Sequence, residues 1–192
     1  MSKITMELVK ELREKTQVGM MDCKKALTDA DGDLEKAIEL LRKKGAAVAA
    51  KRSDNTANNG RIEGYVAPDF TSGSLAHVSC ETDFSANTEF MQTFAQTVAQ
   101  QVNEKNPASV QELNGQKLFN NSAMTVQDQL NELCAKICEN IQVGSFARYH
   151  VEGNGVVNAY IHAGSTVGCL VELATDKPVG QHTQILAQAA KD

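Results

Sequence analysis

Residues 75–84 read LAHVSCETDF and join an extended segment to a helical one. Residues 75–80 form a short strand-like run, and a helical pattern begins near Asn87. Between them, Asp83 and Phe84 place a carboxylate beside a large aromatic ring on the turn. The residues alone leave two interpretations open, because Phe84 could pack in the core or stay exposed for a partner protein.

The strand-like run that leads into this turn is one of five such segments, which the turn residues between them indicate to be hairpins. They cover residues 61–66, 74–80, 141–151, 156–162 and 167–173. Because the strands arrive as hairpins and do not alternate singly with helices, the sequence predicts an α+β fold with antiparallel sheets and packed helices.

Three helical patterns separate the early strands from the late ones. The first has an apolar stripe over residues 90–102 and is expected to end before Pro107, because proline cannot continue a helix. A capping-box pattern at residues 109–112 predicts a short second helix, and a third can begin at Thr125.

Residues 4–45 predict three short amphipathic helices that form a bundle. The second helix follows Gly19, and Asp33 is placed to cap the third. Gly45 is a natural stop for the third helix, and residues 46–52 are left open as a prolongation of that helix or the beginning of the linker. The polar run at residues 53–60 predicts a linker.

The domain organisation follows from these patterns. We expect a three-helix N-terminal domain at residues 1–52, a linker at 53–60, a core subdomain at 61–148 and the start of a second core subdomain at 149–192. The last amphipathic pattern covers little more than two turns, and a helix that short rarely holds by itself. We therefore expect the last subdomain to be incomplete and the chain to be truncated at its C-terminus.

The composition narrows the functional classes. A net charge of −5 without a concentrated basic footprint argues against direct nucleic-acid binding. No apolar run approaches the roughly 18 residues of a membrane helix, which predicts no membrane association. Five scattered cysteines and no visible secretory signal predict a cytoplasmic protein with free thiols.

The cysteines are interpreted as structural. Cys134 and Cys138 lie four residues apart on a predicted helix, but no second pair of ligands with zinc-like spacing lies nearby. Both are therefore predicted to be buried thiols, and the others, Cys23, Cys80 and Cys169, are interpreted likewise as small apolar residues.

The sequence contains no complete catalytic set. His77 lies at an odd offset from Cys80 and so on the opposite face of the same strand, which argues against a Cys–His pair. There is no glycine-rich phosphate loop and no nucleophile elbow. The sequence therefore predicts a binding protein without cofactor or metal, and not an enzyme.

Met20 and Met21 form a second apolar feature. Adjacent helical residues differ by about 100° in direction, and Cys23, Ala26 and Leu27 occupy the expected core face. At least one of the two methionines is therefore expected to be exposed. The residues leave open whether the pair fills the core or forms an adaptable patch for a partner.

Several motifs together resemble the bacterial elongation factor Ts family. The run GMMDCKKAL at residues 19–27, preceded by KELREKT at 10–16, resembles the N-terminal domain of that family, and ETDF at 81–84 resembles its signature. Residues 139–141, and the Tyr-x-His and Gly-x-Leu-Val patterns at 160–162 and 168–171, are also similar. The resemblance covers essentially the whole chain.

The resemblance implies a fold and a function. The fold would be a three-helix, ubiquitin-associated-like domain followed by a core of two α+β subdomains. The function would be guanine-nucleotide exchange: binding elongation factor Tu in its GDP-bound and nucleotide-free forms, with an assembly of two copies of each protein considered.

By the same resemblance, three groups of residues would contact the partner. Thr82, Asp83, Phe84 and Ser85 would disturb the elements around its Mg²⁺ ion. Met20, Met21 and Lys24 would dock elsewhere on the same GTPase domain. His162 and its turn would face the rest of the partner.

The chain departs from the family pattern in two places. After Phe84 the family commonly has Val-Ala-Arg/Lys-Asn, whereas this chain has Ser85-Ala86-Asn87-Thr88, and Gly144-Ser145 stands near the usual place of an arginine pair.

The alternative function is an adaptor that binds proteins without driving exchange.

Overall fold

The computed structural model describes residues 4–191, and the contacts divide the chain into two compact units. The first unit contains the residues up to Thr56 together with Gln127–Ile141, and the second contains Ala57–Val126 and the residues from Gln142 onward. The chain therefore crosses between the units three times. The domain boundaries at residues 52, 60 and 148 stay predictions.

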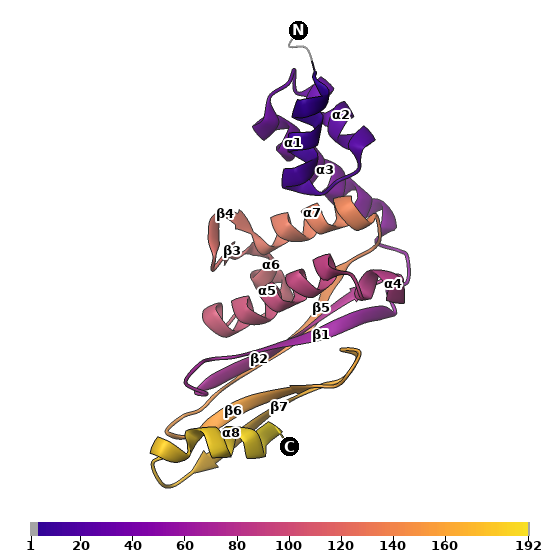
Figure 1. Ribbon diagram of the computed structural model, residues 1–192. Helices are drawn as coiled ribbons and strands as arrows, with labels where there is room; N and C mark the ends of the chain where they lie inside the picture. The colour runs from indigo at the N-terminus through magenta and orange to yellow at the C-terminus, as the bar shows by residue number, and fades with distance from the viewer. Residues whose placement is uncertain (1–3, 192) are drawn as a thin grey trace. The chain divides into compact units, whose positions relative to one another are not determined.

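Three helices at the N-terminus build most of the first unit (Figure 1): α1 (Met6–Thr16), α2 (Met20–Asp29) and α3 (Leu34–Arg52). The Asp33 side chain accepts a hydrogen bond from the Lys36 amide at 3.0 Å, so the predicted cap of α3 is confirmed. Leu12, Leu27 and Ala37 are fully buried between the helices. The N-terminal three-helix bundle is therefore as predicted.

The prediction that Gly45 ends the third helix is wrong, because α3 continues to Arg52. A Cβ atom at Gly45 would lie 1.9 Å from the backbone oxygen of Asn131, which is in α7 (Val126–Ile137). Gly45 therefore allows two helix backbones to approach closely, and it does not act as a helix stop.

Polar contacts also join α7 to the N-terminal helices. The Arg42 Nε donates to Glu132 Oε1 at 2.6 Å. Just beyond the ends of α7 and α3, the Asn140 side chain donates to the backbone oxygen of Asn55 at 2.8 Å. The pairing of Arg42 with Glu132 spans ninety positions of sequence. This long-range packing explains why α7 belongs to the first unit.

An antiparallel sheet forms the centre of the second unit, in the order β1 (Asn59–Val66), β2 (Ser72–Cys80), β5 (Gln142–His150). A separate antiparallel hairpin consists of β6 (Asn154–Ile161) and β7 (Gly168–Thr175). The predicted α+β class with antiparallel sheets is therefore confirmed. The first strand begins at Asn59, inside the segment predicted to be a linker.

The second unit is layered (Figure 1). The helix α5 (Glu89–Lys105) covers one face of the sheet, where the Ser74 hydroxyl donates to the Ala99 backbone oxygen at 2.6 Å. The β6–β7 hairpin covers the other face, where Gly73 lies close to Val157. The helix α8 (Thr183–Lys191) packs on that hairpin, and its Ala187 carbonyl accepts a hydrogen bond from Asn158 at 2.6 Å.

Smaller elements complete this unit: α4 (Asp83–Ala86), α6 (Val110–Gly115), β3 (Lys117–Leu118), β4 (Asn121–Thr125) and a 3₁₀ turn at Gly180–His182. The predicted cap of α6 is confirmed, because the Glu112 amide donates to Ser109 Oγ. The hairpin β3–β4 was not predicted. The fully buried Gln101 positions it by bonding the Lys117 carbonyl and the Phe119 amide.

Three cysteines are buried as predicted, namely Cys23, Cys80 and Cys134. Cys138 and Cys169 are exposed, so their assignment to the interior is wrong. Cys138 follows the end of α7 with a φ of 59° and leaves the buried face of that helix. Cys169 pairs across the hairpin with Tyr160, which is itself exposed.

None of the helices within residues 4–191 is long and apolar enough to cross a membrane.

Candidate functional site

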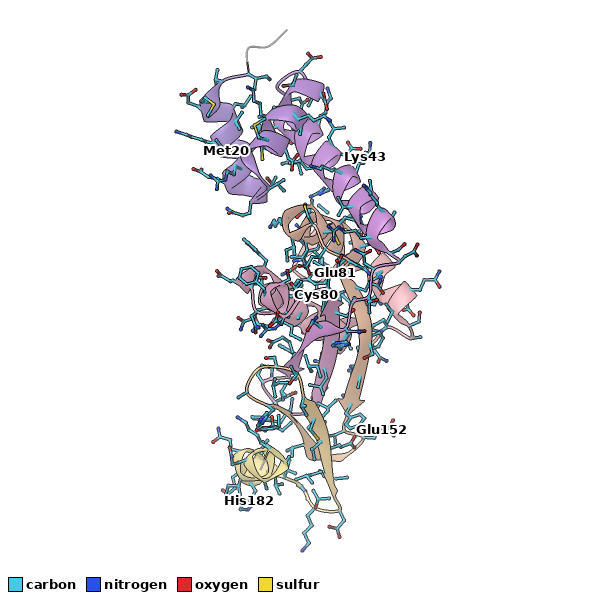
Figure 2. The ribbon with its side chains drawn as sticks, turned by 90° about the vertical axis from the view of Figure 1, so that its right-hand side faces the viewer. Met20, Lys43, Cys80, Glu81, Glu152 and His182 are labelled. Atoms are coloured by element: carbon cyan, nitrogen blue, oxygen red, sulfur yellow. The ribbon has the colours of Figure 1, made fainter. Side chains whose placement is uncertain are left out.

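The turn between β2 and α5 is a single turn of helix, α4. The Thr82 hydroxyl caps it by accepting a hydrogen bond from the Ser85 amide at 3.2 Å. The Cys80 thiol donates to the Thr82 carbonyl at 3.1 Å and connects the cap to the end of β2. Figure 2 labels Cys80 and Glu81, which lead from the strand into this helix. Residues 82–85 are therefore held in a defined backbone conformation.

Phe84 is the most exposed large apolar side chain among residues 4–191, at 81%. Its amide donates to Asp83 Oδ1 at 2.9 Å, and the Asn87 side chain donates to the Asp83 carbonyl at 2.9 Å. The exposure of Phe84 decides between the two interpretations that its sequence position left open. The core does not use this ring, so it is free to enter a pocket on another molecule.

The neighbours of Phe84 divide between the surface and the interior. Thr82 and Asp83 are exposed, whereas Ser85 is 4% exposed. The Ser85 carbonyl accepts a hydrogen bond from the Thr88 hydroxyl at 2.8 Å. Ser85 therefore lies below the surface formed by the other three residues of this motif.

A buried arginine connects α4 to two other elements. Arg61 Nη1 donates to the Ala86 carbonyl at 2.9 Å, and Nη2 donates to Ser165 Oγ at 3.2 Å. Its Nε donates to Glu63 Oε1 at 3.0 Å. Our sequence analysis missed this residue, although opposite charges two positions apart on a buried strand face are a detectable signal.

The turn that follows His162 lies at the same end of the second unit as α4. The Ile62 amide donates to the Ser165 carbonyl at 2.6 Å, which docks the turn on β1. Asp83, His77 and Ser165 line one polar pocket of about 210 Å³. The fold therefore brings the turn next to α4.

His162 itself is exposed on this turn. Its Nδ1 lies 2.9 Å from the Tyr160 hydroxyl, and their ring centroids are 6.1 Å apart. Val167, at the other end of the turn, is 60% exposed. These side chains form a second exposed patch with aromatic and apolar character.

The methionine pair lies at the start of α2 in the first unit, where Figure 2 labels Met20. Met21 is 78% exposed, and Met20 is half-buried against the helical core. The predicted exposure of at least one methionine is confirmed. Lys24 is exposed one turn further along the helix.

The buried thiols of Cys23 and Cys134 are poorly suited to nucleophilic chemistry. Burial raises the pKa of Cys134 from 9.0 to about 11, and burial also raises the pKa of Cys23. Both groups therefore stay protonated near neutral pH. In the part of the chain that the structure describes, no three His, Cys, Asp or Glu residues gather in a way that could hold a metal ion.

The fold and site together define an α+β protein with an exposed aromatic side chain on a short helix. The family model for elongation factor TS matches residues 81–191, which is more than half of the chain. The chain belongs to the elongation factor Ts family.

Curated relatives in two Clostridium species extend the likeness over nearly the whole chain. An elongation factor Ts of Clostridium perfringens (strain SM101 / Type A) is 47% identical over 98% of this chain and 60% of its own length. One of Clostridium botulinum (strain Eklund 17B / Type B) is 46% identical over 90% of this chain and 56% of its own length. The chain thus spans about 60% of the length of these relatives.

Proposed function

We propose that this chain acts as a guanine-nucleotide exchange factor in translation elongation. It binds elongation factor Tu in its GDP-bound form and promotes the release of GDP. Membership of the elongation factor Ts family supports this function. The structural observation that carries it is Phe84, which is 81% exposed on a capped and braced helix.

Exchange requires no bond chemistry from this chain. A protein that binds the nucleotide-free form of a GTPase more tightly than the GDP-bound form must lower the affinity of the GTPase for GDP by the same factor. An aromatic ring that enters between helices of the GTPase shifts the elements around its Mg²⁺ ion and phosphate site. The capped backbone of α4 favours this use, because a backbone segment that is already ordered loses little freedom on binding.

We assign three contact regions to the proposed complex. Thr82, Asp83 and Phe84 contact the region near the Mg²⁺ ion, while the buried Ser85 supports them from below. Met20, Met21 and Lys24 make a second contact through α2, where the exposed Met21 offers an adaptable apolar surface. His162 and its turn make a third.

The setting of this function is the cytoplasm, where translation elongation takes place. The proposal also includes an assembly of two copies of this chain with two of elongation factor Tu. Direct contact with nucleic acid or membrane has no part in it.

A fluorescent GDP analogue tests the proposal. The analogue is loaded on elongation factor Tu, and its release is followed after mixing with excess unlabelled GDP, with and without this chain. The proposal predicts faster release that saturates with the concentration of the chain. Release at the spontaneous rate at every concentration would contradict it.

The adaptor function is the second candidate, and the exposed Met21 favours it, because such a surface can bind a partner without entering the nucleotide site. Calorimetric titration of elongation factor Tu with this chain separates the two. Binding that leaves GDP release unchanged would support the adaptor, whereas binding with faster release supports exchange.

A further inference from the structure

We infer that Arg61 is a positioning residue for the docking surface: its buried guanidinium fixes α4, and with it Phe84, against the turn between β6 and β7. The consequence for exchange rests on the proposed function. The structural consequence does not, since it concerns contacts within the second unit alone.

The guanidinium joins three elements at once. From β1 it donates to the carbonyl that ends α4, to the hydroxyl of Ser165 in the turn, and to Glu63 on its own strand. A planar guanidinium carries five N–H donors in a fixed arrangement, so one side chain can bond partners on three elements at once. A lysine at this position would keep the positive charge but lose the planar arrangement of N–H donors.

Burial makes this arrangement specific. Arg61 is 8% exposed and Glu63 is 9% exposed, and buried charges have to be paired. A buried ion pair is weak evidence for stability, because well-packed apolar residues often do as well or better. Here the pair instead fixes positions, because Arg61 on β1 bonds both the end of α4 and the turn between β6 and β7.

The helix α4 needs such support. It has four residues, and a helix of that length does not hold by itself. Its N-terminal end is capped by Thr82, and the Asn87 amide donates to the carbonyls of Asp83 and Phe84. Arg61 occupies the Ala86 carbonyl with a charge-assisted hydrogen bond. Phe84 is largely exposed and contributes little packing that would hold the helix in place.

Amide hydrogen exchange on the free protein tests the structural part. In Arg61→Lys, the amides of Ala86, Asn87 and Ile62 are expected to exchange at least about tenfold faster, because they donate to Thr82, Asp83 and Ser165 within α4 and the turn. Amides in the middle of α5 are expected to keep their protection. Unchanged protection of all three reporter amides would overturn the inference.

Two further variants sharpen this test. Arg148→Lys is the matched control, because Arg148 Nε also donates to a backbone carbonyl, that of Asn103 at 2.9 Å, but contacts neither α4 nor the turn. It is expected to leave the reporter amides unchanged. Ser165→Ala removes only the contact with the turn and covers the case in which Arg61→Lys fails to fold. It is expected to speed exchange at Ile62, and unchanged protection there would count against the inference.

A double-mutant cycle tests the consequence for exchange. Arg61→Lys is expected to slow GDP release from elongation factor Tu about five- to tenfold in the otherwise unchanged chain, and less than about twofold in the Phe84→Ala background. An equal loss in both backgrounds would show that Arg61 does not act through Phe84. If the unchanged chain does not accelerate GDP release at all, the proposed function fails, and the hydrogen-exchange result alone decides the role of Arg61.

Discussion

Phe84 contributes little to the folded core. Because its ring is 81% exposed, replacing it removes little buried apolar surface. We predict that Phe84→Ala shifts the thermal midpoint by less than about 2 °C while slowing GDP release at least about tenfold. Circular dichroism on heating measures the first effect, and fluorescent-nucleotide release measures the second.

Phe94 supplies the matched control for this prediction. It is 2% exposed in α5, so Phe94→Ala is expected to cost about 3–5 kcal/mol of unfolding free energy. A comparable loss of stability in Phe84→Ala would show that the ring belongs to the core, which was the other interpretation of its sequence position.

Cys134 gives a pH prediction. Its folded-state pKa is raised to about 11 from 9.0 by burial, so the neutral thiol is the form that the fold favours. The associated stability is fully present below pH 9.0 and is lost as the pH rises through about 11. Between about pH 8 and pH 11 the unfolding free energy of the unchanged chain should fall about 2 kcal/mol more than that of Cys134→Ala.

Urea denaturation at a series of pH values measures this difference. The comparison with Cys134→Ala removes the contributions of lysines and tyrosines, which titrate in the same range in both proteins. Parallel pH profiles for the two proteins would mean that the Cys134 thiol is accessible to water.

At the scale of elements, the contact between α3 and α7 depends on the missing side chain at Gly45. Glycine to alanine inside a helix ordinarily gains up to about 1 kcal/mol. Here the new Cβ would meet the Asn131 backbone, so we predict that Gly45→Ala lowers the unfolding free energy by about 1–3 kcal/mol. Chemical denaturation measures the change.

Gly115 is a control for the same substitution. It ends α6, and a Cβ there would have nothing within 4 Å. Gly115→Ala is expected to change stability by no more than about 0.5 kcal/mol. If both substitutions behaved alike, α3 and α7 would not pack closely in solution.

The helices and hairpins could be predicted because local patterns specify them. Asp33 caps α3, Ser109 caps α6, and Asn106 ends α5 just before Pro107, all as the sequence indicates. Gly45 was misread because a glycine after a helical pattern usually marks a stop, and its true role depends on a helix more than eighty residues later. The hairpin β3–β4 escaped because it is short and largely exposed.

The candidate site could be predicted from the sequence only where local patterns specify it. The exposure of at least one residue of the Met20–Met21 pair follows from helical spacing, and the motif at 81–84 marks Phe84 as a candidate without deciding its exposure. The hydrogen bonds of Arg61 reach Ala86 and Ser165, which lie 25 and 104 positions away in the sequence. No local pattern indicates such contacts. The exposed cysteines were misplaced because residue type alone cannot show which face a thiol occupies after a helix ends.

At the scale of the whole molecule, the chain presents exposed apolar contacts on both of its compact units. Met21 lies on the first unit, and Phe84 and the patch around His162 lie on the second. We propose that Phe84 disturbs the nucleotide site of elongation factor Tu and that the other exposed side chains dock on that protein. Removing Met21 should therefore weaken binding, while removing Phe84 should lower the maximal rate of GDP release.

The role of Phe84 is best tested by the maximal rate of GDP release from elongation factor Tu, measured at saturating concentrations of the unchanged chain and of Phe84→Ala. We expect acceleration by the unchanged chain and at least about a tenfold lower maximal rate with the variant, even when both bind fully. Equal maximal rates for the two proteins would contradict it.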